Sequence, residues 1–115
     1  MIDDKVNEDV KAGLKHATAS FYDVLPPAAE LPLKPAGEWN VSRILVQGNH
    51  VEHWLNGEKV LEYELGSEKV KAGLAESKFR KFPDFGTKIQ GHIMLTHHND
   101  ECSFRNIKIR ELPAK

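Results

Sequence analysis

Three runs of apolar residues, separated by short polar pieces, predict a small antiparallel sheet. They are Val41–Val46, Val51–Leu55 and Val60–Leu65. The strongest turn signal is Asn56-Gly57, between the second and third runs, because both residues tolerate a positive φ. We therefore expect a β-hairpin at the centre of a largely antiparallel β chain.

Further strands are predicted on either side of this hairpin. Ala17–Leu25 reads as a short strand that ends at a pair of prolines, and the proline-rich stretch Ala28–Ala36 reads as a surface crossing. Gly86–Thr96 and Ser103–Leu112 are the last two predicted strands, joined by a polar turn over residues 97–100. The polar residues 3–15 predict a long loop with at most one weak helical turn.

One short helix is predicted from Ser67 to about Lys78. Ser67 is a suitable N-cap, and Val70 and Leu74 are spaced four apart on one helical face. Gly73 would weaken the helix by about 1 kcal/mol relative to Ala. The helix is therefore expected to depend on packing.

Side chains that share a face of a strand can be predicted, because successive residues of a strand point to opposite sides. With a two-residue turn, one hairpin face would carry Val51, His53, Leu55 and Val60, and the other Trp54, Leu61 and Tyr63. Both faces are partly apolar, so neither is expected to face only water.

The last two predicted strands carry unusual faces. The first of them, Gly86–Thr96, has a polar, uncharged face that suits a carbohydrate cleft. This face consists of Gln90, His92, Met94, Thr96 and, just beyond the strand, His98. In the other, Arg105 lies on the same side as Ile107 and Ile109, so a guanidinium continues an expected buried face.

Composition and charge limit the classes of partner. A chain of 115 residues is one domain, residues 1–115, and its net charge of −1 argues against nucleic acid or an anionic membrane as partner. No apolar run approaches a membrane span, and the first residues do not resemble a signal peptide. Cys102 is the single cysteine, which excludes an internal disulfide framework.

Several motifs in order carry a family resemblance. They are Pro35-Ala36-Gly37-Glu38-Trp39-Asn40, Gly48-Asn49, His53-Trp54-Leu55-Asn56-Gly57, Ser77-Lys78-Phe79, Gly91-His92-Ile93-Met94-Leu95 and Phe104-Arg105-Asn106-Ile107 with the following Lys108–Leu112. Together they resemble the 3-keto-disaccharide hydrolase family, a former domain of unknown function, over nearly the whole chain.

The resemblance implies an all-β fold: an antiparallel jelly-roll or β-sandwich of the concanavalin-like type, with one short helix. Ile2-Asp3-Asp4 resembles the end of a family strand, so the chain is expected to be the C-terminal part of the domain, incomplete at its N-terminus. Exposed sheet edges or an uncovered apolar face would then favour association, for example as a homo-oligomer. The resemblance also implies export to the periplasm or the cell exterior, for which this chain carries no leader.

The family chemistry implies a hydrolase or lyase acting on 3-keto-glycosides or 3-keto-disaccharides by elimination and hydration. Such a reaction needs a base, an acid for the departing oxygen and a cationic group for the enolate, and a divalent metal could serve as Lewis acid. The alternative is a non-catalytic carbohydrate-binding module. A third option is a glycosidase with a carboxylate pair such as Glu62 and Glu64, for which a solvated strand face is the simpler explanation.

The resemblance implies that His98 and Arg105 are the leading candidates for catalytic residues. His98 matches the histidine of a family turn and is expected to act as acid, base or ligand, although His97 replaces the family's aspartate. Arg105 matches the family's Phe-Arg-Asn-Ile motif and is expected to line the cleft. A buried ion pair is the alternative for this arginine.

The other candidates are weighed against simpler roles. Asp4 is a catalytic and Asp3 a substrate-binding candidate, with a solvated terminus as the alternative. His53 is either catalytic or a hydrogen-bonded core histidine. The substrate-binding candidates are Trp54, Tyr63 and His92, of which the two aromatic residues could instead pack in the core or at its rim.

Overall fold

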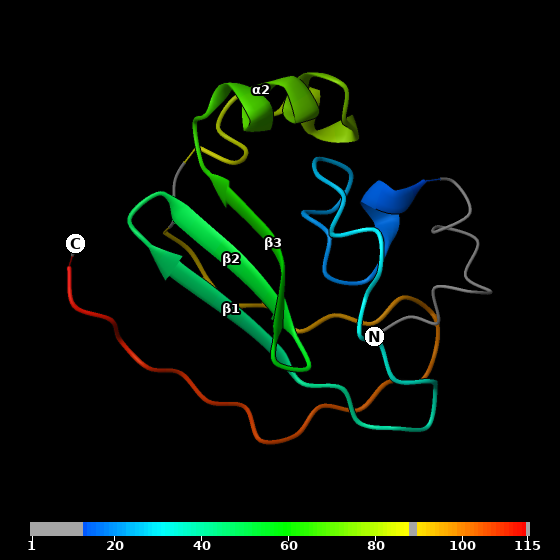
Figure 1. Ribbon diagram of the computed structural model, residues 1–115. Coiled ribbons are helices and arrows are strands. Elements are labelled where there is room, and N and C mark those ends of the chain that lie inside the picture. Colours follow the sequence, from blue (N-terminus) through cyan, green and yellow to red (C-terminus); the bar gives the residue numbers. More distant parts are fainter. Residues whose placement is uncertain (1–12, 88–89, 115) are drawn as a thin grey trace.

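The computed structural model describes residues 13–87 and 90–114. It contains a three-stranded antiparallel sheet in the order β1-β2-β3, one α-helix and two short 3-10 helices (Figure 1). Their bounds are η1 (Leu14–His16), β1 (Ser42–Gln47), β2 (His50–Leu55), β3 (Glu58–Glu64), α2 (Glu68–Ala75) and η2 (Lys78–Lys81). The three central predicted strands and the helix are thus confirmed.

The predicted Asn56-Gly57 turn joins β2 to β3. Both residues have a positive φ, 48° at Asn56 and 86° at Gly57. The Asn56 side chain also accepts a hydrogen bond from the Val41 backbone N at 2.8 Å and donates one to the Pro32 carbonyl at 2.6 Å. The turn residue therefore holds the start of β1 and the preceding loop against the hairpin.

The predicted division of the hairpin faces is wrong, because a β-bulge shifts the register. His53 lies opposite Leu61 and Trp54 lies opposite Lys59, which leaves Val60 as the extra residue. Leu61 and Tyr63 consequently share the face of His53. The carbonyl of Val60 accepts a hydrogen bond from the Ala28 backbone N at 2.7 Å, so the bulge anchors the segment before β1.

The helix α2 begins as predicted and ends earlier. The Ser67 hydroxyl accepts a bond from the Val70 backbone N at 3.4 Å, as an N-cap does. The α-helix ends at Ala75, and the buried Ser77 then caps η2 by accepting from the Phe79 backbone N at 3.1 Å. The predicted helix therefore divides into an α-helix and a 3-10 helix.

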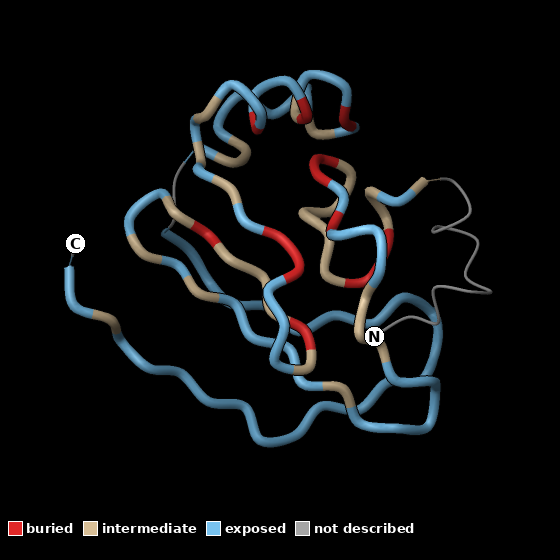
Figure 2. The backbone as a smooth tube through the Cα atoms, in the orientation of Figure 1, coloured by how far each residue is buried: buried red, intermediate tan, exposed pale blue. Residues whose placement is uncertain are grey.

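The hydrophobic core lies between the hairpin, α2 and the segment 17–27 (Figure 2). Its buried residues are Val24, Leu25, Leu61 and Val70, with Phe21, Tyr63, Leu74, Phe79 and Phe85 packed against them. The rings of Phe79 and Phe85 stack with centroids 4.0 Å apart. This core covers β3 and β2, whereas two apolar side chains of β1 remain exposed, Val46 and, at 65%, Ile44.

The prediction of a strand over 17–25 is wrong. The segment consists of turns, and its one β-type contact is an isolated bridge between Phe21 and Leu25. Ala19 and Asp23 adopt left-handed backbone conformations with φ of 66° and 62°, which an extended strand excludes. The chain folds back on itself here and places Val24 and Leu25 in the core.

The predicted strands 86–96 and 103–112 are not formed by the described residues. Residues 90–110 are extended or bent and exposed throughout, and no strand within residues 13–87 offers them a hydrogen-bonding partner. Asn99 and Asn106 have positive φ, 65° and 57°, so side chains do not alternate regularly past them. The face that was to bury Arg105 beside two isoleucines is therefore open, with Ile107 exposed at 65%.

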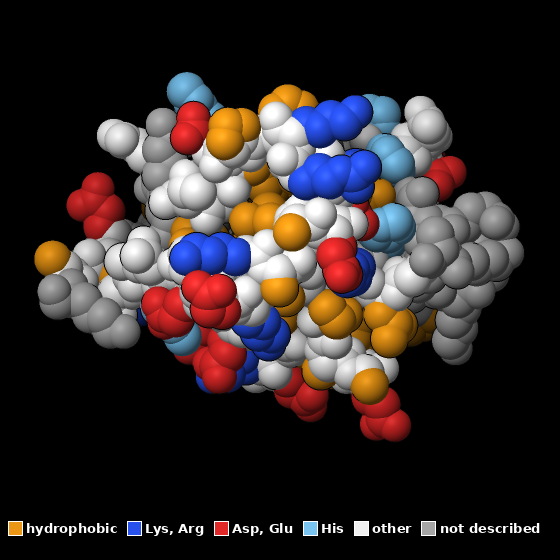
Figure 3. Space-filling model, turned by 90° about the horizontal axis from the view of Figure 1, so that it is seen from above, with side chains coloured by type: hydrophobic (Ala, Val, Ile, Leu, Met, Phe, Trp, Pro, Cys, Tyr) orange, Lys and Arg blue, Asp and Glu red, His pale blue; other side chains and the backbone are white. Residues whose placement is uncertain are grey.

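The observed architecture is mainly sheet with one α-helix, which is consistent with an incomplete β-sandwich. No helix within residues 13–87 and 90–114 is long and apolar enough to cross a membrane. On the side that carries α2, acidic and basic side chains are mixed with hydrophobic ones rather than gathered by sign (Figure 3).

Candidate functional site

A groove of about 2560 Å³ lies between β1, the loop before it and the C-terminal segment. Residues 103–112 run alongside β1 in the ribbon view without pairing to it (Figure 1). The Gln47 side-chain amide at the end of β1 donates a hydrogen bond to the Pro113 carbonyl at 3.2 Å. The groove is therefore walled by segments far apart in sequence.

Arg105 and Trp39 both line this groove and contact each other. The guanidinium carbon of Arg105 lies 3.9 Å from the centroid of the Trp39 ring, a cation–π contact. Trp39 is 44% exposed, so part of its ring remains available to a ligand. The pair combines an aromatic surface with a fixed positive charge.

The backbone beside Trp39 is fixed by Asn40. The Asn40 side-chain oxygen accepts from the Lys34 backbone N at 2.8 Å, and its amide nitrogen donates to the Lys34 carbonyl at 3.2 Å. The same oxygen accepts from the Asn56 side chain at 2.8 Å, which connects this clamp to the hairpin turn. Trp39 was not predicted as a site residue, although it lies in one of the motifs that carry the family resemblance.

The charges lining the groove are of both signs. Acidic residues there are Glu38, Glu101 and Glu111, and basic ones are Lys34, Arg43, Arg105, Lys108 and Arg110. No histidine lines it within the part of the chain that the structure describes. The described groove thus offers cations, carboxylates and the aromatic rings of Trp39 and Phe104, but no imidazole.

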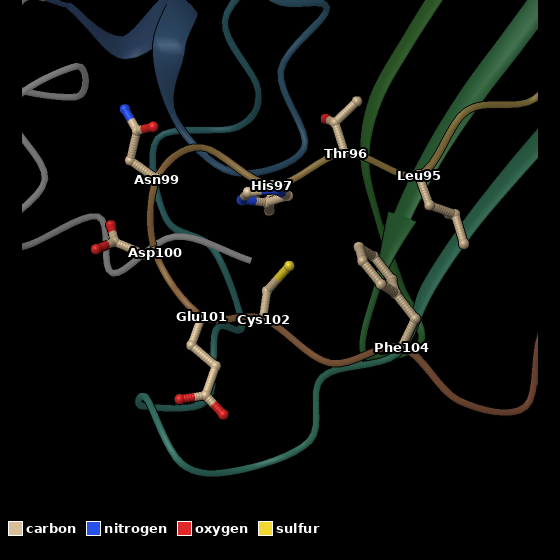
Figure 4. A pocket seen from close by; sticks show the side chains of 8 residues that line it. All are labelled: Leu95, Thr96, His97, Asn99, Asp100, Glu101, Cys102 and Phe104. Carbon is tan, nitrogen blue, oxygen red and sulfur yellow. The ribbon is translucent and has the colours of Figure 1, made fainter.

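A smaller cavity of about 450 Å³ lies in the turn that follows residue 95 (Figure 4). The His97 ring and the Cys102 thiol lie on the inner side of this turn, whereas Asn99, Asp100 and Glu101 point away. His98 is exposed and lines neither this cavity nor the groove. The structure therefore does not bring His98 and Arg105 into one described cavity.

His53 lies on the inner face of β2 and is half-buried. Its Nδ1 donates to the Ala19 carbonyl at 2.8 Å, which leaves Nε2 to accept from the Tyr63 hydroxyl at 3.2 Å. Burial lowers the pKa of His53, against the opposing effect of the Ala19 bond, and raises the pKa of Tyr63 to about 12. Both groups are therefore neutral near pH 7, as in a core hydrogen-bonded pair.

The remaining predicted site residues are not part of the His53–Tyr63 pair. Trp54 lies on the outer face of β2, where its Nε1–H donates to Glu52 at 2.6 Å and the Arg43 guanidinium lies 5.2 Å from its ring. His92 is exposed in the extended segment. Asp3 and Asp4 lie outside the described residues.

The groove does not gather a set of metal ligands from the described residues. Among the described residues, the one cluster with three ligating side chains in mutual reach is His50, Glu52 and Glu62, on the outer face of the hairpin. None of its members lines the groove. The described residues of the groove therefore do not place three ligating side chains within reach of one divalent ion.

Comparison with known proteins gives three results. Residues 1–110 match the family described as the 3-keto-alpha-glucoside-1,2-lyase-like domain. The chain is 35% identical over 124 aligned positions to a 3-keto-disaccharide hydrolase of Bacteroides thetaiotaomicron, covering 97% of this chain and 42% of that protein. It is also similar to the crystal structure of a Parabacteroides distasonis protein whose suggested activity is that of a glycosyl hydrolase, with 38% identity and a TM-score of 0.56 over 62% of this chain and 32% of the other.

The chain thus spans less than half the length of each of these relatives. The family match extends over the hairpin, the helix and the C-terminal segment, and so includes both walls of the groove that holds Trp39 and Arg105. On these grounds the chain belongs to the 3-keto-alpha-glucoside-1,2-lyase-like domain family.

Proposed function

We propose that the chain is the C-terminal part of a carbohydrate-active hydrolase or lyase that cleaves 3-keto-glycosides or 3-keto-disaccharides by elimination and hydration. Its fold would be an incomplete concanavalin-like jelly roll, with residues 1–115 in a single domain. The observation that carries the proposal is the Arg105–Trp39 pair in the groove, within the segments that match the family. The name of the Bacteroides relative supplies the substrate class.

The chemistry follows from the ketone at carbon 3 of the sugar. This ketone acidifies the proton on carbon 2, so a base can remove it and leave an enolate. Collapse of the enolate forms a double bond between carbons 1 and 2 and breaks the bond from carbon 1 to the leaving oxygen, which takes a proton from an acid. Water then adds its hydroxyl to carbon 1 while carbon 2 regains a proton, and the net reaction is hydrolysis.

Arg105 suits the stabilising role in this scheme. A guanidinium is always charged and donates several hydrogen bonds, so it can hold an oxygen on which negative charge develops. The Trp39 ring provides an apolar surface for a sugar ring, and Asn40 fixes the backbone next to it. The two residues would thus orient the sugar and stabilise the enolate.

The proton-transfer roles are assigned to residues that are not among the described residues of the groove. His98 is proposed as acid or base and Asp4 as a further catalytic residue, while Asp3 is proposed as a substrate contact. His92, Trp54 and Tyr63 remain proposed substrate contacts. The hydrogen bonds of His53 to Ala19 and Tyr63 favour a positioning role for this histidine over direct proton transfer.

A carbohydrate-binding module is the second candidate. Within the described residues the groove has two aromatic rings and hydrogen-bonding charged groups but no histidine, a composition that suffices for binding a sugar without cleaving it. The chain also spans only 42% of the Bacteroides relative.

Association with another chain is also proposed. Ile44 of β1 and Ile107 of the C-terminal segment are each 65% exposed, and contact with a second copy would bury such residues. Sedimentation equilibrium tests this directly: concentration-dependent mass supports association, whereas a monomer at high concentration contradicts it.

The enzyme and the module are distinguished by release of an aglycone. The chain is incubated with an aryl 3-keto-glucoside, with and without a chelator, and the released phenol is measured. Turnover that Arg105→Ala and His98→Ala abolish, while the exposed-residue control Arg80→Ala retains it, supports the enzyme. Saturable binding without release supports the module, and neither binding nor release contradicts both.

A further inference from the structure

The outer face of the β2–β3 hairpin carries a cluster of a histidine and carboxylates that neither the groove nor the family match explains. In the strand register His50 lies opposite Glu64, and Glu52 lies opposite Glu62. Alternation places all four side chains on the face that points away from the core. The donor atoms of His50, Glu52 and Glu62 lie within 4.8 Å of one another.

We propose that His50, Glu52 and Glu62 bind a divalent transition-metal ion, with Nε2 of the histidine and one oxygen of each carboxylate as ligands. Neighbouring ligands on a tetrahedral zinc ion are about 3.4 Å apart. The cluster, whose donor atoms lie within 4.8 Å of one another, therefore needs to contract by no more than about 1.5 Å, which side-chain rotations can supply. Mixed imidazole and carboxylate ligands suit zinc and its neighbours better than calcium or magnesium.

Two further groups hold the ligands in place. Nδ1 of His50 lies 2.6 Å from a Glu64 oxygen, so this carboxylate fixes the orientation of the ring and leaves Nε2 directed at Glu52, 3.1 Å away. The indole N–H of Trp54 binds one Glu52 oxygen at 2.6 Å, and the other oxygen faces the cluster. A carboxylate behind a ligating imidazole is the usual support of a metal-binding histidine.

A cation already lies among these groups. The Lys59 ammonium donates to Glu62 and lies 3.8 Å from the Glu52 oxygen that faces His50. The ammonium group ends a flexible side chain, so it can rotate toward solvent when a metal ion enters. The site is thus shaped for positive charge, and Lys59 competes with the metal for it.

None of the proposed ligands lines the groove or the smaller cavity, so this site is independent of the proposed function. Its role would be to clamp β2 to β3, which metal binding to the folded chain would stabilise against unfolding.

The test is a calorimetric titration of zinc into the reduced chain. The wild type is expected to bind one zinc ion, with affinity reduced about tenfold or more in His50→Ala, Glu62→Gln and Glu64→Gln. Lys59→Met is expected to bind more tightly, because the competing ammonium is gone. A control with both His97→Ala and His98→Ala is expected to bind as the wild type does.

Circular dichroism checks that each variant is folded. If His50→Ala does not fold, Glu62→Gln tests the same site in its place. Equal zinc affinity in the wild type and in folded His50→Ala or Glu62→Gln would overturn the proposal. So would loss of binding in the double histidine control, or the absence of saturable binding.

Discussion

Nδ1 of His53 lies 2.8 Å from the carbonyl oxygen of Ala19, so a side chain of β2 fastens a loop residue 34 positions earlier. A carbonyl can only accept, which assigns the ring proton to Nδ1 and leaves Nε2 to accept from the Tyr63 hydroxyl. Ala19 has a left-handed backbone with φ of 66°. The bond therefore stabilises a strained turn on which the placement of Val24 and Leu25 depends.

Replacing His53 by alanine is expected to destabilise the chain by about 2 kcal/mol, since two hydrogen bonds are lost and a partly buried carbonyl and hydroxyl are left without this partner. Urea denaturation followed by tryptophan fluorescence measures the change. The control is His92→Ala, which replaces an exposed histidine of the extended segment and should leave stability unchanged. Full stability of His53→Ala together with loss of sugar cleavage would instead make His53 catalytic.

The stabilising effect of His53 is expected to depend on pH. Burial lowers its pKa in the folded chain below the unfolded value of about 6.5, so the unfolded state binds the proton more strongly. The contribution is then complete above about pH 6.5 and declines as the pH falls toward the folded pKa. The difference in unfolding free energy between wild type and His53→Ala should therefore shrink from about pH 7 to about pH 5. A constant difference would contradict a buried neutral imidazole.

Asp23 is expected to connect the loop 17–25 to η2. Its carboxylate accepts from the Lys78 backbone N at 2.8 Å and from His16 at 3.0 Å, and these bonds, that of Lys78 first, lower the pKa of Asp23. Asp23→Asn should therefore cost about 1 kcal/mol near neutral pH. Because the folded pKa is depressed, this loss is full above about pH 4 and disappears at lower pH.

Denaturation of Asp23→Asn at several pH values measures this effect. The matched control is Asp84→Asn, whose carboxylate is exposed on a turn. A cost for Asp23→Asn that is the same at neutral and strongly acidic pH would show that the charge of Asp23 is not responsible.

Gly73 is expected to resist replacement, although the middle of a helix normally favours alanine by about 1 kcal/mol. A Cβ at this position would lie 2.5 Å from the Val24 carbonyl oxygen, a backbone atom that cannot move away cheaply. Gly73→Ala should therefore lower the thermal midpoint, whereas Gly91→Ala, which has open space around it, should not. A higher midpoint for Gly73→Ala would mean that α2 can shift away from Val24.

The sequence predicted the parts of the fold that local signals specify. Asn56-Gly57 has the backbone angles that its turn requires, and Ser67 caps α2 as expected. The bulge at Val60 has no local signal, because it depends on the packing of β3 and on the Ala28 bond. One extra residue was enough to move Tyr63 to the face of His53.

The predicted strands that the described residues do not form show that alternation of polar and apolar side chains is insufficient to predict a strand. Residues 103–112 have suitable side chains, but a strand also needs a hydrogen-bonding neighbour, and the described chain supplies none. Arg105 lines the groove next to a tryptophan that no local pattern selected as a site residue, and its role there stays a prediction. The positive φ of Asn106 also interrupts the alternation from which its position was predicted.

The central claim is that Arg105 and Trp39 form a sugar site, and calorimetric titration with 3-keto-glucose tests it most directly. We expect saturable binding by the wild type, affinity reduced about tenfold or more in both Arg105→Ala and Trp39→Ala, and unchanged affinity in Arg80→Ala. Equal affinity in all four proteins, or no binding by the wild type, would contradict the claim.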